Sequence, residues 1–127
     1  MPLRASAIKP SAPDPLANLF ARGRIDEAQY AAGRQFQKHF ELADKRRPEQ
    51  PDGLADDQVK AWQMLTRCYQ TLGQDGSAIV CDVLIHGMSA GEVAKSRGKA
   101  GQDGGRFYRM RLQECLRTLA EVYGFAH

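Results

Sequence analysis

The segment Gly87–Gly98 constrains the fold most, because it encodes a short helix with a defined beginning and end. Ser89 and Glu92 have the Ser-x-x-Glu spacing of a capping box, in which the two residues satisfy each other's free backbone N–H groups. Gly98 can end the helix, since glycine readily adopts the left-handed conformation that follows helix C-termini. The pattern therefore predicts a helix over 90–97 with turns on both sides.

Two longer apolar patterns flank this short helix. A nearly continuous apolar run predicts a largely buried helix over 77–86. A second stripe predicts a long helix over 106–123, and its members are Tyr108, Leu112, Cys115, Leu119 and Val122. A short capped helix followed by a long basic one is typical of a helix-turn-helix, whose second helix can enter the major groove of DNA.

Positive charge gathers in the same part of the chain. The net charge is only +3, but residues 95–117 hold seven Lys and Arg against two Asp and Glu. Arginine can bind guanine, and glutamine adenine, through two hydrogen bonds each. We therefore expect the groove to be read by Arg106, Arg109, Arg111 and Gln113, with Arg117 in the same row and Lys95, Arg97 and Lys99 on phosphates. An alternative is that this row is the solvated face of an ordinary amphipathic helix.

Elsewhere the sequence predicts an all-α bundle of about six helices, with no alternation long enough for a strand. Residues 1–13 hold three prolines and predict a flexible, disordered tail. The segment 14–47 predicts a pair of helices that begins with Asp14 as an N-cap before Pro15, and 48–53 predicts a linker. Residues 54–127 would form the helix-turn-helix core, in one domain with 14–47.

The remaining residues favour packing over chemistry. Trp62 and Tyr69 recur at helical spacing on a predicted helix over 54–72, and we expect both to anchor the core. Three cysteines without C-x-x-C spacing favour buried free thiols in a reducing compartment over disulfides or zinc. No acid, base and nucleophile converge, and no apolar run could span a membrane. We therefore expect a cytoplasmic protein that is not an enzyme and needs no metal or cofactor.

Two resemblances extend this interpretation. The segment Gly87–Gly98, continued by Arg111-Leu112 and by 116–120, resembles the helix-turn-helix of region 4 of bacterial sigma factors. Residues 14–124 also resemble an uncharacterised domain family of alphaproteobacterial prophages, which includes the carboxyl-terminal part of the transcription activator of gene transfer agents. The matching motifs are Leu16-Ala17-x-Leu19-x-x-x-Gly23-x-Ile25, Gln29-x-x-Ala32-Gly33-x-x-Phe36-x-x-x-Phe40, Arg111-Leu112 and Leu119-Ala120-x-x-Tyr123-Gly124.

The second resemblance implies a phage-derived transcription regulator that acts on double-stranded DNA, on RNA polymerase, or on both. One departure is that seven residues separate Gly98 from Arg106, where sigma-like turns use only a few. Such a turn could bring Lys99 to a phosphate or could displace the third helix from the groove. The alternative is a module that docks on RNA polymerase or another regulator without touching DNA, through partly exposed Leu16, Leu19 and Phe20.

Overall fold

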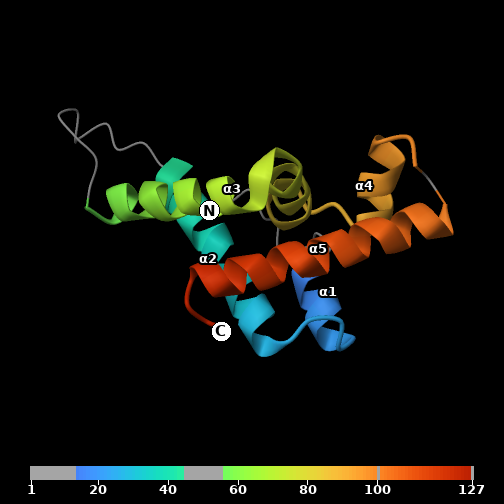
Figure 1. Ribbon diagram of the computed structural model, residues 1–127, viewed down its shortest axis with the longest axis horizontal. Coiled ribbons are helices and arrows are strands. Elements are labelled where there is room, and N and C mark those ends of the chain that lie inside the picture. The colour runs from blue at the N-terminus through green and yellow to red at the C-terminus, as the bar shows by residue number, and fades with distance from the viewer. Residues whose placement is uncertain (1–13, 45–55, 100, 127) are drawn as a thin grey trace, which may run out of the picture.

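The computed structural model describes residues 14–44, 56–99 and 101–126, and every regular element in these ranges is helical (Figure 1). This confirms the all-α prediction. The elements are α1 (Pro15–Ala21), α2 (Glu27–Asp44), α3 (Asp56–Val80), the π-helix η1 (Cys81–Ile85), α4 (Ala90–Ser96) and α5 (Gln102–Val122). The expected tail over 1–13 and the linker over 48–53 lie outside the described residues.

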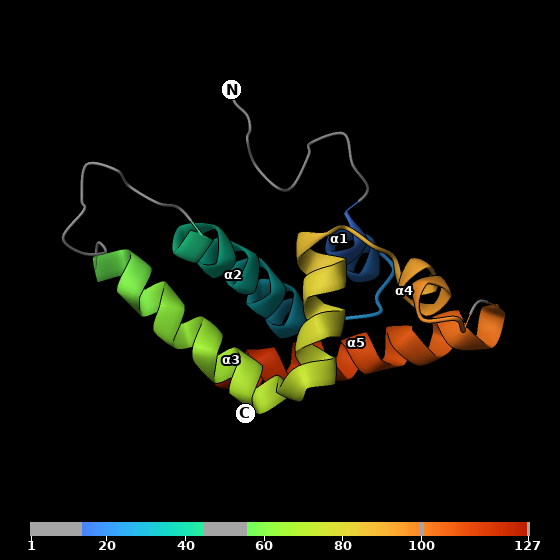
Figure 2. The same ribbon diagram turned by 90° about the horizontal axis from the view of Figure 1, so that it is seen from above.

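Helix α5 organises the molecule. It packs against α2 and α3 along part of its length and against α4 near its N-terminal end, while α1 lies beside α2 and η1 (Figures 1 and 2). Its inward face is fully or almost fully buried, and so are the core residues of α2 and η1. These core residues include Phe36, Leu84, Leu112, Leu116 and Leu119. Burying each such side chain contributes about 1.5–3 kcal/mol, and one core cluster joins α5 to α2 and η1.

Helix α1 begins as the sequence predicts, but its apolar face is not free. The Asp14 carboxylate accepts a hydrogen bond from the Ala17 N–H at 3.1 Å, with Pro15 in the first turn. Leu16 is fully buried, because both of its terminal methyl groups lie against Gly33 of α2. The expectation that Leu16 is partly exposed is therefore wrong: the missing side chain at Gly33 makes room for it.

Helix α3 differs from the expected pair of helices around a turn at 73–76. Only Gly73 leaves helical geometry, with φ 79° and ψ 175°, and the chain bends there and continues as a helix (Figure 2). Trp62 is 51% exposed, so its predicted role as a core anchor is wrong. Ala61, a small residue, and Leu65 face the core instead, and Tyr69 is partly buried against it. A one-residue difference in helix phase, about 100°, is enough to exchange Trp62 for Ala61.

Three buried glutamines, which the sequence analysis did not single out, bind the helices together through backbone carbonyls. Gln37 donates to the Leu84 carbonyl at 2.8 Å and Gln58 to the Leu42 carbonyl at 3.2 Å. Both acceptors lie in the last turn of a helix, where carbonyls have no partner within the helix. Gln29 donates to a carbonyl on α5 at 2.9 Å. The three cysteine thiols are free; Cys68 and Cys115 are buried as the sequence predicts, whereas Cys81 is only partly buried.

Candidate functional site

Helix α4 has the capping box that the sequence predicts. The Ser89 hydroxyl accepts a hydrogen bond from the Glu92 N–H at 3.1 Å, and the Glu92 carboxylate accepts one from the Ser89 N–H at 2.9 Å. Val93 and Ala94 are fully buried against the neighbouring elements. The local sequence thus fixes where this short helix begins and which face it buries.

The turn between α4 and α5 is shorter than the sequence suggests. Helix α5 begins at Gln102, so 102–105 are helical, and the expected long glycine-rich turn before Arg106 is wrong. Glycine's low helix propensity favours a turn there, but close packing outweighs it. A Cβ on Gly104 would lie 1.7 Å from the Lys99 carbonyl oxygen, and one on Gly105 would lie 3.7 Å from the Gly91 Cα. The glycines let the turn and α4 approach the first turns of α5.

Two of the arginines expected on DNA are partnered within the protein. Arg97 pairs with Asp75 at 2.7 Å, and Arg111 pairs with the other oxygen of the same carboxylate at 3.4 Å. The hydrogen bond from Arg97, helped by Arg111, lowers the pKa of Asp75. The Arg97 guanidinium also lies 5.3 Å from the ring centre of Tyr108. Asp75 therefore joins α3 to the end of α4 and to α5 through ion pairs with these two arginines.

The residues expected to face DNA along α5 also differ in whether their side chains form contacts within the protein. The Gln113 amide donates to the Arg24 carbonyl at 2.7 Å, which ties α5 to the segment after α1. Arg109 is partly buried, and its Nε has neither solvent contact nor a hydrogen-bond partner among the residues that the structure describes. Arg106 and Arg117 are exposed and form no ion pair within the described part of the chain. Only these two keep the freedom that groove or phosphate contacts require.

Exposed lysines lie beside the free end of α5. Lys95 and Lys99 are exposed and, among the described residues, have no carboxylate within ion-pair distance. The Lys99 ammonium lies 6.0 Å from the ring centre of Phe107, at the outer limit of a cation–π contact. The α4–α5 corner therefore presents Lys95, Lys99 and Arg106 without internal neutralisation.

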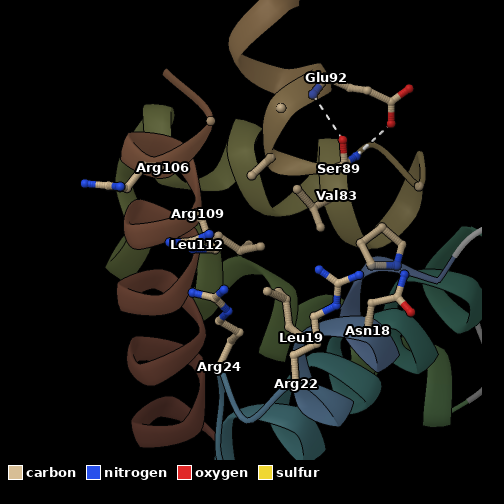
Figure 3. A pocket seen from close by; sticks show the side chains of 15 residues that line it. Asn18, Leu19, Arg22, Arg24, Val83, Ser89, Glu92, Arg106, Arg109 and Leu112 are labelled. Atoms are coloured by element: carbon tan, nitrogen blue, oxygen red, sulfur yellow. Dashed lines mark hydrogen bonds between the residues drawn. The ribbon is translucent and has the colours of Figure 1, made fainter. Parts of the chain in front are cut away.

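A cleft of about 720 Å³ opens between α1, the segment 87–92 and α5 (Figure 3). Its floor is apolar, and arginines from distant parts of the chain surround it. They are Arg22, Arg24, Arg106 and Arg109. The sequence analysis missed Arg22 and Arg24, because only tertiary packing brings the end of α1 against α5. Their position on either side of Gly23, which ends α1, is a weak local signal at most.

Some apolar side chains remain on the surface. Phe107 and Met110, which neighbour Arg106 on α5, are 52% and 56% exposed. Phe20 is 38% exposed and stacks on Tyr30 with ring centres 4.5 Å apart, whereas Leu19 is partly buried and lines the cleft. Of the expected interaction residues on α1, only Phe20 offers substantial apolar surface.

Other classes of site have little support in the described ranges. No three His, Cys, Asp or Glu side chains there gather closely enough to hold a metal ion. No helix in this part of the chain combines the length and apolar character needed to cross a bilayer. Comparisons with protein-family models, curated proteins and solved structures gave no match.

Proposed function

We propose that this chain is a DNA-binding transcription regulator of phage or mobile-element origin, in which α4 and α5 act as a helix-turn-helix. The observation that supports this most is the short, closely packed turn between a capped α4 and an α5 whose N-terminal end carries the unpaired Arg106. Because α5 begins at Gln102, three residues rather than seven lie between Gly98 and the next helix, which is closer to the length of sigma-like turns and supports the proposal. The phage origin depends on the resemblance of residues 14–124 alone.

The structure narrows the set of residues that we assign to DNA. Arg106 lies in the second turn of α5, where the N-terminal residues of a recognition helix meet base edges. We assign Lys95 and Lys99 to phosphates that border the groove. We assign Arg117, which lies further along α5, to the DNA backbone. Arg97, Arg111 and Gln113 leave the set because their side chains bind within the protein. Binding should weaken steeply with salt, since each phosphate contact releases counterions.

Arg106→Ala is expected to weaken specific binding by about tenfold or more, since one bidentate base contact is worth about 1–3 kcal/mol. Fluorescence anisotropy would compare DNA from upstream of the protein's own operon with random duplex at several salt concentrations. The matched control is Arg67→Ala, which removes an exposed arginine from α3. If the two variants bind the upstream DNA as tightly as the parent, α5 does not read the groove.

A second candidate is a module that docks on RNA polymerase or another regulator. The exposed Phe107 and Met110 favour it, because large apolar side chains at the exposed end of a helix are typical anchors of protein interfaces. Under this alternative, Phe107→Ser with Met110→Ser should abolish nuclease-resistant capture of polymerase subunits and leave DNA affinity within about twofold. Capture by the parent that persists in the double variant, or no capture by the parent, would count against it.

A further inference from the structure

The cleft between α1, the segment 87–92 and α5 combines an apolar floor with a cationic wall. Leu19, Val83 and Leu112 line its base, from α1, η1 and α5 respectively. Figure 3 shows Arg22 extending from the end of α1 towards the segment that carries Ser89, and Arg24 lying beside α5 near Arg109. Small-molecule pockets combine apolar side chains with convergent polar groups, both of which this cleft has, and its volume lies within their usual range.

Within the described ranges, no carboxylate pairs with the arginines that Arg106 accompanies in the cleft. Arg22, Arg24 and Arg109 form no ion pair among the described residues. Glu92 is the one carboxylate among the lining residues, and it is engaged in the capping box with Ser89. Three guanidinium groups that share one cleft without a carboxylate partner favour an anion from outside.

Arg109 contributes the third guanidinium group to the cleft. Its Nε is shielded from solvent and donates to no acceptor within the described structure. Because a shielded atom cannot contact a ligand in the cleft, the ligand would meet the terminal nitrogens of Arg109, and the Nε–H group reports on their surroundings. Arg106 also lines the cleft, but its guanidinium points away from it in Figure 3, so the two arginines need not serve the same ligand.

We propose that this cleft binds a small amphipathic anion, in which a phosphate or carboxylate head meets Arg22, Arg24 and Arg109 while an apolar body covers Leu19 and Leu112. Arginine forks match carboxylate and phosphate oxygens with paired hydrogen bonds. The site adjoins the DNA surface proposed above, with Arg106 at their common edge pointing away from the cleft, and its occupant joins α1 to the α4–α5 unit.

Phenyl phosphate is a suitable probe, because it carries a phosphate dianion on an apolar ring. Titrated into the ¹⁵N-labelled full chain without DNA, it should bind saturably with a Kd of about 0.1–1 mM and shift the Arg109 Nε–H resonance. Benzyl alcohol and inorganic phosphate, which supply the ring or the anion alone, should bind at least about tenfold more weakly. Equal binding of benzyl alcohol, or no saturation with phenyl phosphate, would overturn the proposal.

Paired variants locate the site. Arg22→Gln, a surface change that should leave the fold intact, is expected to weaken phenyl phosphate binding at least about fivefold. Arg67→Gln removes an exposed arginine of α3 outside the cleft and should leave the affinity for phenyl phosphate unchanged. Equal affinities of these two variants would place the probe elsewhere. Displacement of phenyl phosphate by duplex DNA would assign the cleft to the DNA surface and would also overturn the proposal. The effect of Arg106→Ala on DNA binding tests the proposed function alone and does not bear on the cleft.

Discussion

Replacing Gly104 by alanine is expected to lower the free energy of unfolding by about 2–4 kcal/mol. An added Cβ would lie 1.7 Å from the Lys99 carbonyl oxygen and 2.9 Å from its carbonyl carbon, and backbone cannot move aside as the end of a side chain can. Either α5 loses its first turn, or the turn after α4 moves. Such a movement would strain the hydrogen bond from the Lys99 N–H to the Ala94 carbonyl, whose N···O distance is 2.8 Å. Domains of this size are stable by only about 5–15 kcal/mol, so the loss is large.

The adjacent glycine provides the control. A Cβ on Gly105 would meet only the Gly91 Cα at 3.7 Å, an ordinary contact. Alanine is a better helix former than glycine by about 1 kcal/mol, so Gly105→Ala should be neutral or stabilising. Urea denaturation followed by circular dichroism would measure both variants. Equal stability of the two would mean that the turn does not press on α5 at Gly104.

This pair also explains why the sequence predicts α4 better than α5. The beginning of α4 depends on contacts between Ser89 and Glu92, three residues apart, and such contacts can be inferred from spacing alone. The beginning of α5 depends on whether Gly104 and Gly105 face open solvent or a neighbouring backbone. Glycine spacing carries no information on that, and glycine propensity favours the wrong answer.

The same distinction applies to the candidate site. The sequence predicts that the basic residues of 95–117 are concentrated on α4, on the turn and on α5. It does not predict which of them are free, because their partners are remote in sequence. Asp75 engages Arg97 and Arg111, and the Arg24 carbonyl engages Gln113 across 89 residues. The cleft escapes prediction for the same reason, since two of its four arginines, Arg22 and Arg24, come from the segment that follows α1.

Leu16→Ala is expected to lower the free energy of unfolding by about 2–5 kcal/mol, as for other fully buried leucines. The change removes the methyl groups that lie against Gly33 and leaves a cavity between α1 and α2. Thermal and urea denaturation of the full chain would measure it. Asn18→Ala, which shortens an exposed polar side chain of the same helix, is the matched control and should change the free energy of unfolding by less than about 0.5 kcal/mol.

A double-mutant cycle would establish that Leu16 and Gly33 act together. Alone, Gly33→Ala should destabilise by about 1–3 kcal/mol, because its Cβ would lie 2.8 Å from both Leu16 methyl carbons in a closed core. In the Leu16→Ala background the same change should stabilise by about 1 kcal/mol, since the new methyl group enters the cavity and alanine favours the helix. Additive effects would refute this contact. If the effect of Gly33→Ala on stability changes sign in the Leu16→Ala background, Leu16 acts through its contact with α2. A loss of partner or DNA binding in a Leu16 variant is then explained by unfolding of α1 and not by a lost interface.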